Sequence, residues 1–411
     1  MSAFRSAARG ITFGMALAIG ATASTNTLAQ IAVSANDGRA KLENGKVVVD
    51  KSGVDTITLI DLAATPPKAV GELPVPASVA GPPSSVALTP NEELALVTSA
   101  LKHDPADPTK QVPNDVVSVV ELNRASGVGG LVNRLRGKQA APAFAPKVIA
   151  TLTVGKGAAG IAINRAGTLA LVANRNEGTV SVLTIAGKTV TVLPDKIRLG
   201  DEKSGPSGIA ISPDGRLALV TLDGESANKI AILEIDGTTV TFAKRDLSAG
   251  LRPYGIDIDA KGEIAVVANI GRNLGDVDTV SVIDLKAKPI RVVNTVSVGQ
   301  VPEGIKISPD GNYVAVSVMN GTNRASGAPY YSDKGKLVLL RRRGTELTRA
   351  TETNVGRWCQ GIVWSTNSRR VFVQCMVEQQ VLGFSWNASV LQPIGAVATK
   401  GGPAGIRTSE K

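Results

Sequence analysis

The chain has 411 residues, with 45 lysines and arginines against 35 aspartates and glutamates, and it contains one histidine and two cysteines. This inventory excludes several kinds of chemistry, because the sequence has no Ser-His-Asp set, no His/Cys spacing typical of a metal site, no phosphate-binding glycine loop and no haem-attachment motif. The single histidine, His103, lies in the polar stretch 100–110, and we interpret it as a surface residue rather than a general base.

Residues 1–29 have the three parts of a secretory signal peptide: a basic start with Arg5 and Arg9, an apolar run at 11–20, and small residues before a cleavage site after Ala23 or Ala29. The apolar run is shorter than the ~20 residues of a membrane-spanning helix. No comparable run follows. We therefore expect an exported, periplasmic protein (full secretion is the alternative) with no membrane span and a single domain over residues 30–411.

The formal net charge of +10 bears on possible partners. A basic surface attracts anions, but an exported protein rarely meets nucleic acid, and we expect no nucleic-acid partner. A small anionic molecule or a protein partner fits better. The alternative is that mild basicity only maintains solubility. We expect a monomer.

A glycine-led phrase recurs along the chain, with an apolar stretch, a tight turn and a second apolar stretch. Examples are GIAISPDGRLALVTL at 208–222 and GIKISPDGNYVAVSV at 304–318. Copies begin at positions 84, 160, 208, 255, 304 and 361, and a truncated copy, GIRTS, begins at 405. From Gly160 onward the copies start 44 to 57 residues apart. Such a period is the signature of repeated supersecondary units.

Each repeat predicts four antiparallel strands, because two further apolar stretches follow the phrase, such as TVSVLTI at 179–185 and RVVNTVSV at 291–298. Four-stranded units at this spacing are typical of β-propeller blades. Near the N-terminus, KVVVD at 46–50 and the stretches 55–62 and 67–73 read as second, third and fourth strands without a first. We predict an all-β, seven-bladed β-propeller, closed by the C-terminal strand joining the N-terminal blade. A two-domain enzyme is the alternative.

The phrases GIAISPDG at 208–215, LALVANRNEGTVSVLTI at 169–185 and AVVAN at 265–269 resemble the YVTN-repeat family of bacterial seven-bladed propellers, over about residues 46–408. The tetrapeptide that names the family is mostly Val-Ala-Asn or Val-Thr here, without its tyrosine. The resemblance implies the propeller fold. The family is similar to propeller lactonases, quinoprotein dehydrogenase heavy chains and surface-layer antigens, so it does not name an activity.

Long loops indicate which face of the propeller carries the binding site. With the strands of a blade lettered a to d from the axis outward, the b–c and d–a connections share one face. The insertions 100–115, 270–278 and 320–334 fall in b–c connections, and 123–146 is a c–d insertion that we expect to be flexible. Because binding groups concentrate on loops held by a rigid scaffold, we expect the ligand on the b–c face.

The d–a connections and the ends of strands b on this face carry polar side chains that predict a net-basic funnel for an anion. The expected ligand-binding residues are Arg175, Arg252, Tyr254, Asn269, Glu303, Asn320, Arg357, Trp358 and Gln360. The alternative is that Asn shapes turns and Arg forms a solvated rim. The third positions of neighbouring strands a include Asp257 and Lys306, which we predict to be a structural ion pair.

One blade contains all three tryptophans and both cysteines. Trp364 occupies a position filled elsewhere by isoleucine and is expected in the core, whereas Trp358 is the better candidate for a ligand. A hairpin over 361–376 that turns at 367–368 places Cys359 opposite Cys375. In an oxidising compartment this pair predicts a structural disulfide. A redox role is the alternative.

Two functions remain open. The first is a binding protein for a small anionic ligand or a protein partner, accessory to envelope or redox machinery. The second is a lactonase-like hydrolase or isomerase acting in the same funnel through Glu303, Arg252 and Arg357, although propeller lactonases typically use His, Glu and Arg and no motif carries those roles here. We expect no cofactor and no metal. The absent histidine motif favours the first function.

Overall fold

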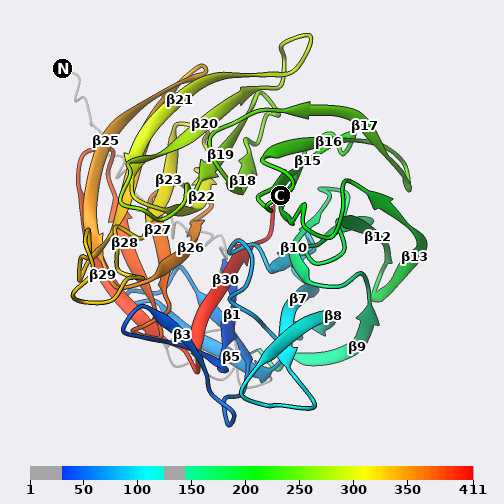
Figure 1. The fold of residues 1–411 in the computed structure, drawn as a ribbon, viewed down its shortest axis with the longest axis horizontal. Coiled ribbons are helices and arrows are strands. Elements are labelled where there is room, and N and C mark those ends of the chain that lie inside the picture. Colours follow the sequence, from blue (N-terminus) through cyan, green and yellow to red (C-terminus); the bar gives the residue numbers. More distant parts are fainter. Residues whose placement is uncertain (1–29, 125–143, 411) are drawn as a thin grey trace, which may run out of the picture.

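Seven four-stranded antiparallel sheets are arranged in a ring in the computed structural model, which describes residues 30–124 and 144–410 (Figure 1). Every named element in those ranges is a β-strand, so the predicted all-β propeller is confirmed. No helix among the described residues is long and apolar enough to cross a membrane. The expected signal peptide and residues 125–143 of the c–d insertion lie outside the described residues.

The blades are numbered from the N-terminus, and strands are given from the axis outward. Blade 1 contains β30 (Gly402–Thr408), β1 (Ile31–Asp37), β4 (Thr56–Asp61) and β5 (Lys68–Pro74). Blade 2 contains β6 (Val86–Leu88), β7 (Leu94–His103), β8 (Gln111–Glu121) and β9 (Lys147–Thr153). Blade 3 contains β10 (Ala158–Ile163), β11 (Leu169–Asn174), β12 (Thr179–Ala186) and β13 (Thr189–Arg198). Blade 4 contains β14 (Pro206–Ile211), β15 (Leu217–Leu222), β16 (Lys229–Asp236) and β17 (Thr239–Leu247).

The remaining blades follow the same order. Blade 5 contains β18 (Pro253–Ile258), β19 (Ile264–Asn269), β20 (Asp278–Asp284) and β21 (Arg291–Gly299). Blade 6 contains β22 (Pro302–Ile307), β23 (Tyr313–Val318), β24 (Gly335–Arg343) and β25 (Glu346–Val355). Blade 7 contains β26 (Cys359–Trp364), β27 (Arg370–Cys375), β28 (Gln380–Trp386) and β29 (Leu391–Ala398). A separate hairpin pairs β2 (Ala40–Glu43) with β3 (Lys46–Val49).

The ring closes as predicted, because β30 pairs antiparallel with β1, from Ala32 opposite Thr408 to Asp37 opposite Gly402. In space β30 also contacts the innermost strands β26 and β6 on either side. Gln30 adds a second connection: its amide donates to the Trp364 carbonyl, and its side-chain oxygen accepts from the Thr366 N–H. The chain ends are therefore fastened to each other, which removes the free sheet edges.

One strand assignment from the sequence is wrong. The stretch KVVVD at 46–50 was expected to be the second strand of blade 1, but that place belongs to β1, and β3 pairs only with β2. The cause is that β1 ends in a long b–c connection, residues 38–55, which contains its own short hairpin. The insertion 100–115 also differs from a simple loop, because β7 and β8 extend into it as far as His103 and Gln111.

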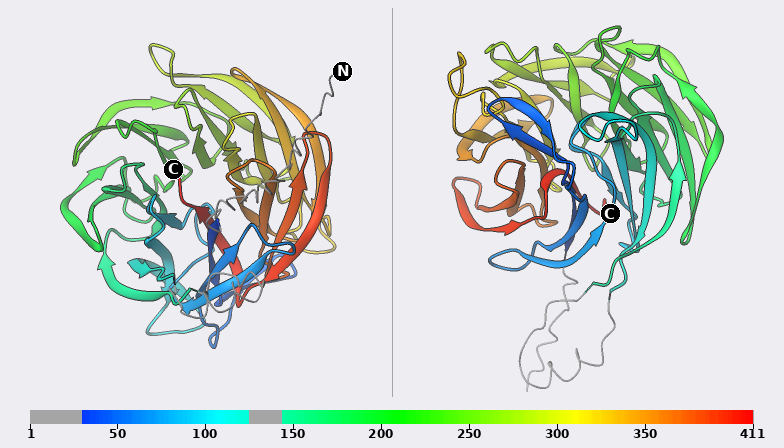
Figure 2. Two further views of the ribbon diagram at one scale, coloured as in Figure 1. Left: turned by 180° about the vertical axis from the view of Figure 1, so that it is seen from behind. Right: turned by 60° about the horizontal axis from the view of Figure 1, so that its bottom comes forward.

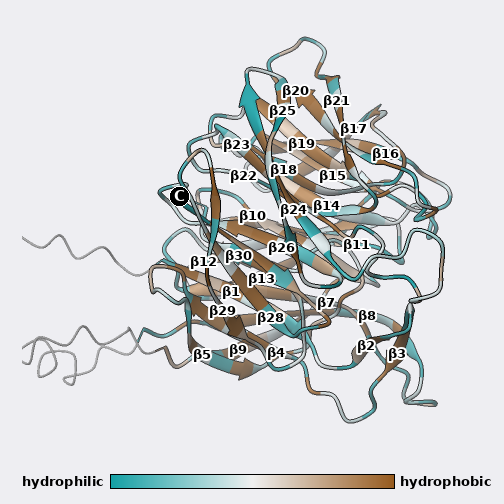
Figure 3. Cartoon of the chain, turned by 90° about the vertical axis from the view of Figure 1, so that its left-hand side faces the viewer, coloured by the Kyte–Doolittle hydropathy of each residue, from teal (hydrophilic) through white to brown (hydrophobic). Residues whose placement is uncertain are grey.

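Burial explains why the sequence alternates differently in inner and outer strands. Strand β19 is buried along its whole length, because neighbouring blades cover both its faces, whereas β21 alternates between exposed and partly buried residues. Figure 3 shows the same contrast, with brown apolar strands inside and teal polar segments at the loops. Trp364 is 2% exposed in the core between blades 6 and 7, as predicted.

The recurring glycine is required by contact between blades. A Cβ on Gly304 would lie 1.9 Å from the Gln360 carbonyl oxygen of blade 7, and a Cβ on Gly255 would lie 2.2 Å from the Glu303 carbonyl oxygen of blade 6. No side chain fits at such distances, so each glycine lets the next innermost strand approach. The repeat seen in the sequence is thus the contact that assembles the ring.

Candidate functional site

Six of the seven innermost strands begin with an irregular step in their pairing, and this step points a side chain toward the axis. In β22 the pairing with β23 shifts between Pro302 and Ile305, so Glu303 and Gly304 lie outside the regular ladder. The same shift occurs at the start of β10, β14, β18 and β26. β-Bulges commonly redirect side chains next to functional sites. Here they place one residue of each bulged strand at the b–c end of the central channel.

The seven residues directly before the repeated glycine or its counterpart Ser85 are asymmetric around the ring. In blade order they are Ala404, Ser84, Ala159, Ser207, Tyr254, Glu303 and Gln360. Blades 1 to 4 thus contribute small residues, and blades 5 to 7 contribute large polar ones. All seven are buried. The asymmetry leaves one side of the channel end lined by three neighbouring polar side chains.

The backbone of the same three blades is strained. Three residues before the repeated glycine, blades 3 and 4 carry Gly157 and Gly205 with positive φ. Blades 5 to 7 keep this left-handed conformation with Arg252 (φ 55°), Val301 (φ 56°) and Trp358 (φ 46°). The left-handed region costs a non-glycine residue about 1–2 kcal/mol. Such strain persists mainly at functional sites, so it favours blades 5–7 as the location of a site.

A buried carboxylate organises the charges at this end. Asp223, directly after β15, accepts from Nη1 and Nη2 of Arg175, at 2.5 and 2.9 Å, and from Ser207 Oγ at 2.5 Å. Arg252 Nη2 lies 3.2 Å from Asp223 Oδ2. Burial by itself raises the pKa of Asp223, but the hydrogen bonds and charge of Arg175 outweigh it and hold the pKa below its usual value. Asp223 is therefore ionised, and both of its carboxylate oxygens already accept hydrogen bonds.

Glu303 behaves in the opposite way. Burial raises the pKa of Glu303 to about 8, and a hydrogen bond from Gln360 and the charge of Arg252 only partly offset this. At neutral pH the carboxyl group is protonated and can donate a hydrogen bond. Its Oε2, like Oε1 of Gln360, has no hydrogen-bond partner among the described residues. These two atoms come from neighbouring blades and are the clearest sign of an unmet bonding requirement.

Tyr254 and Trp358 form the apolar side of the site. Burial raises the pKa of the Tyr254 hydroxyl well above its ordinary value, so this hydroxyl stays protonated. Tyr254 and Trp358 belong to one apolar cluster with Met319 and Met376. The hairpin β2–β3, called the cap hairpin below, packs onto this cluster through its residue Ala40.

The tip of the cap hairpin reaches blade 6. The Ser326 N–H donates to Asn44 Oδ1 at 3.0 Å, and a Cβ on Gly45 would lie 2.3 Å from the Ala325 nitrogen. Figure 2 (right) shows this blue hairpin standing out from blade 1 toward the yellow loop of blade 6. The hairpin therefore covers the apolar cluster from the b–c face.

Five predicted site residues thus come together with Asp223. We call this group the axial cluster: Arg175, Asp223, Arg252, Tyr254, Glu303 and Gln360. Trp358 borders it. The expected open funnel is not what surrounds them, because Tyr254 is 7%, Glu303 7%, Trp358 9% and Gln360 1% exposed. The blades and the cap hairpin bury the end of the channel.

Three other predicted site residues hold the loops of their own blade. Asn269 donates to Thr279 and Ser281 across to the third strand. Asn320 donates to Ser332 Oγ and the Lys334 carbonyl, which ties the ends of the loop 320–334. Arg357 pairs with Glu378 at 3.2 Å and is half-exposed. None of the three donates to a member of the axial cluster.

Asp223 and Ser207 were missed at the sequence level. A signal existed: the repeat position directly after strand b carries Arg175 in blade 3 and Asp223 in blade 4, so opposite charges occupy equivalent positions in adjacent blades. An alignment of the repeats would have shown that Arg175 and Asp223 are opposite charges at equivalent positions. The lengths of the loops do not show this.

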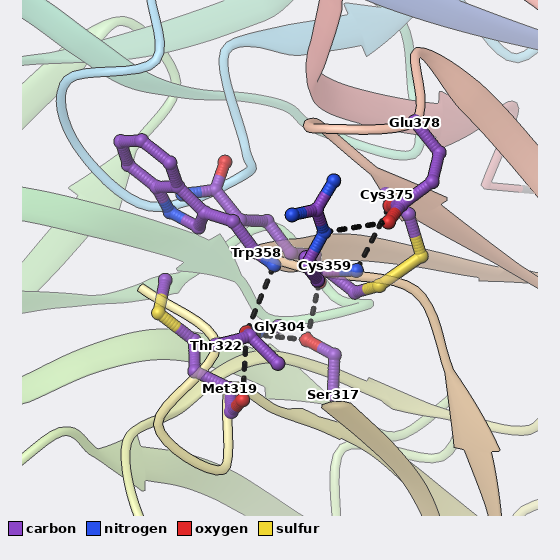
Figure 4. The surroundings of a disulfide bond; sticks show 10 residues. Gly304, Ser317, Met319, Thr322, Trp358, Cys359, Cys375 and Glu378 are labelled. Atoms are coloured by element: carbon purple, nitrogen blue, oxygen red, sulfur yellow. Dashed lines mark hydrogen bonds and ion pairs between the residues drawn. A yellow bond between two sulfur atoms is a disulfide. The ribbon is translucent and has the colours of Figure 1, made fainter. Parts of the chain in front are cut away.

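The predicted disulfide is present, between Cys359 and Cys375, which face each other at the start of β26 and the end of β27. Figure 4 shows that the Trp358 side chain points away from the disulfide, and that the Trp358 N–H donates to Thr322 Oγ1. Blades 4, 5 and 6 carry Pro206, Pro253 and Pro302 at the position of Cys359. The disulfide therefore fixes the start of the one innermost strand among these four that lacks a proline.

We expect reduction of this disulfide, or the Cys359→Ser/Cys375→Ser variant, to lower the free energy of unfolding by about 3 kcal/mol. The reason is that the disulfide closes a short loop, with a sequence separation of 16. The Cys359→Pro/Cys375→Val variant copies the Pro302–Val318 pair of blade 6 and is expected to recover at least a third of this loss. Urea unfolding measures both. Equal stability of the serine variant and the native protein would contradict the prediction.

Among the described residues no three His, Cys, Asp or Glu side chains lie together in a way that could hold a metal ion. The axial cluster instead combines two arginines, one ionised carboxylate, one protonated carboxyl group, a phenol and an amide. Since two guanidinium groups face one ionised carboxylate, one positive charge is left uncompensated.

Comparison with solved structures gives many matches over most of the chain. A candidate 6-phosphogluconolactonase of Bacteroides fragilis is 14% identical, with a TM-score of 0.67 over 94% of this chain and 99% of that chain. A periplasmic gluconolactonase of Pseudomonas aeruginosa is 15% identical, with a TM-score of 0.61 over 92% and 99%. Hydrazine synthase of Kuenenia stuttgartiensis is 17% identical, with a TM-score of 0.57 over 80% and 90%.

At these identities the likeness shows the fold alone. No family model and no curated protein sequence matches the chain. The chain is thus a seven-bladed propeller whose structural neighbours include proteins named as lactonases, and its resemblance to the YVTN-repeat family stays a prediction.

Proposed function

We propose that this protein is an exported binding protein that takes a small, oxygen-rich anion at the axial cluster. The observation that carries the proposal is the pair of buried polar atoms, Glu303 Oε2 and Gln360 Oε1, that have no partner among the described residues. Burying such groups without hydrogen bonds costs about 1–3 kcal/mol each. A ligand with hydroxyl groups would satisfy both atoms at once.

The charge of the cluster supports an anion. Arg252 is the arginine free to bind one, since its side chain is 40% exposed and its contact with Asp223 is longer than that of Arg175. A protonated Glu303 donates a hydrogen bond to an anion, where an ionised carboxylate would repel it. Tyr254 and Trp358 offer apolar surface for the carbon skeleton. This combination of few polar anchors on an apolar wall is typical of small-molecule sites.

The site is buried, so a ligand enters only when its cover moves. The cap hairpin is the covering element outside the blades, and an isolated two-stranded hairpin is marginally stable on its own. Its legs meet at Gly38 and Gly53, where a Cβ on Gly53 would lie 1.8 Å from the Gly38 carbonyl oxygen. We therefore assign the entrance to the hairpin side of the b–c face.

The test is a thermal-shift screen of the mature protein against hydroxy acids, their phosphates and their lactones. A ligand that raises Tm is expected to bind the Arg252→Gln variant at least tenfold more weakly, because one charge-assisted hydrogen bond is worth about 1.5–3 kcal/mol. Arg245→Gln is the matched control, since Arg245 is exposed and donates to the Ile290 carbonyl away from the channel. Equal loss in both variants would contradict the proposed site.

Hydrolysis or isomerisation of a lactone is the second candidate. It is favoured by Glu303, a protonated acid at neutral pH that could protonate a leaving oxygen, and by the lactonase names among the structural neighbours. However, the one ionised carboxylate, Asp223, already accepts from Arg175 and Ser207 and is poorly placed to act as a base for water. Turnover of any lactone that binds, and its loss in Glu303→Gln, would decide for the enzyme.

Export is part of the proposal. It is supported by the signal-peptide pattern of residues 1–29 and by the disulfide between Cys359 and Cys375, which suits an oxidising compartment. Gln30 already takes part in ring closure, so cleavage after Ala23 or Ala29 would leave the ring complete. N-terminal sequencing of the mature protein from a periplasmic extract tests this.

A further inference from the structure

The channel end opposite the axial cluster holds a second charged group. Lys306 lies three residues after Glu303 on β22, which is about 10 Å further along the strand. Its Nζ lies 2.7 Å from Asp257 Oδ1 of blade 5, which confirms the ion pair expected from the sequence, and 2.5 Å from Glu410 Oε1. The lysine thus holds two carboxylates, one from the wall of the channel and one from the end of the chain.

Glu410 reaches Lys306 because the chain crosses the channel after β30. Residues 409 and 410, called the tail here, run from blade 2 to blade 6, because Ser409 Oγ donates to Glu92 Oε1 and Glu410 Oε1 accepts from Lys306 Nζ. The side chains of Lys306 and Asp257 are 13% and 8% exposed, whereas that of Glu410 is 49% exposed. Lys306 and Asp257 therefore belong to the wall, and Glu410 sits on it as a removable occupant.

The surroundings of Glu410 are basic. Burial by itself raises the pKa of Glu410, but the positive charges of Lys306, Arg407 and Arg165 outweigh it and lower the pKa. If Glu410 were absent, three cations would face the single carboxylate of Asp257. In a partly enclosed site such an imbalance attracts an anion strongly.

Space for a ligand is already present beside the tail. A cavity of about 40 Å³ is lined by β6, β10, β14 and β18 together with Arg407 and Glu410. It exists because three innermost strands carry small residues two positions after the repeated glycine or its counterpart Ser85, namely Ala87, Ala162 and Ala210. This volume holds only a few heavy atoms, so a larger ligand must take the place of the Glu410 side chain.

We propose that this channel end is a second anion site, specific for carboxylates and centred on Lys306, which the chain's own Glu410 occupies in the manner of a ligand. The site lies at the other end of the channel from the axial cluster and does not depend on the function proposed there. A carboxylate that binds here competes with the tail, so tail release and ligand binding are coupled.

The test uses the Glu410→Ala variant of the full chain with acetate as the probe, at constant ionic strength kept with chloride. Acetate is expected to raise Tm of Glu410→Ala in a saturable way and to leave the native protein unchanged, because the native site is filled. Ser409→Ala is the matched control: it alters the tail's hydrogen bond to Glu92, keeps Glu410, and should behave as the native protein. An equal response, or an equal lack of response, in Glu410→Ala and the native protein would overturn the proposal.

A second pair of variants covers the case in which Glu410→Ala does not fold. Glu410→Gln keeps the length of the side chain and removes its charge, and it should also gain a saturable acetate response. Adding Arg407→Met to either variant removes one cation while leaving Lys306 and Asp257 paired, and it should weaken acetate binding at least tenfold. Binding that is unaffected by Arg407→Met would place the acetate elsewhere and overturn the proposal.

Discussion

Replacing Glu303 with glutamine is expected to remove a fall in stability that the native protein shows between pH 4.5 and pH 8. The pKa of this carboxyl group is raised by burial from 4.5 to about 8 in the folded protein. Between these values the folded state binds a proton that the unfolded state has lost. Stability therefore falls as pH rises, by up to about 1.4 kcal/mol per pH unit. The favourable contribution is complete below pH 4.5 and lost above pH 8.

Glutamine cannot ionise, so the variant lacks this slope. Relative to the native protein, Glu303→Gln should gain on the order of 4 kcal/mol of unfolding free energy between pH 4.5 and pH 8. Urea unfolding of both proteins across this range measures the difference, in which the titration of all other groups cancels. A difference that does not change with pH, or that changes in the opposite direction, would show that Glu303 is not buried as described.

Gln360→Met serves as the companion variant. Gln360 donates a hydrogen bond that lowers the pKa of Glu303, so its removal should extend the falling limb to higher pH, whereas Glu303→Gln abolishes it. The same titration reports on the proposed function. An anion bound next to Glu303 raises the pKa of that group further, so binding near pH 8 should be accompanied by proton uptake, which calorimetry in two buffers of different ionisation enthalpy detects.

The ring could be predicted from the sequence because one contact repeats. Glycines such as Gly304 admit the backbone carbonyl of the next blade, and this contact recurs in four blades, at Gly160, Gly208, Gly255 and Gly304. A requirement that recurs in this way leaves a visible period. Ring closure by the last strand followed from counting incomplete repeats. β1 was missed for the opposite reason: IAVSAND, after the assumed signal peptide, has no preceding copy of the phrase, and the apolar KVVVD in its b–c connection looked like the missing strand.

The axial cluster could be predicted only in part. Tyr254, Glu303 and Gln360 were predicted because they are polar side chains in the d–a connections, on the face that carries the long loops. Burial could not be read from the loops, since it depends on a bulge that turns these side chains toward the axis and on a hairpin folding over them from blade 1. Asp223 was missed because a single acidic residue after a strand looks like a turn residue until its partner Arg175 is known.

The pair of Arg175 and Asp223 should prove a major energetic contact of the channel end. Asp223 is fully buried, with Arg175 24% exposed, and removing one partner of a buried ion pair costs about 3–5 kcal/mol because the other charge is left uncompensated. Asp223→Met should therefore lower the unfolding free energy by about 3 kcal/mol. Methionine is the appropriate replacement, since blades 6 and 7 carry Met319 and Met376 at the same repeat position.

A double-mutant cycle separates the pair from its surroundings. In the Arg175→Met/Asp223→Met variant no buried charge is left alone, so its loss should be well below the sum of the single losses, with a coupling of at least about 2 kcal/mol. The cycle with Arg252→Met is the matched comparison. Arg252 is 40% exposed and its nitrogen lies 3.2 Å from Asp223, and pairs of this kind couple by less than about 1 kcal/mol. Equal couplings in the two cycles would mean that Arg252 is tied to Asp223 as firmly as Arg175 and is not the arginine available to a ligand.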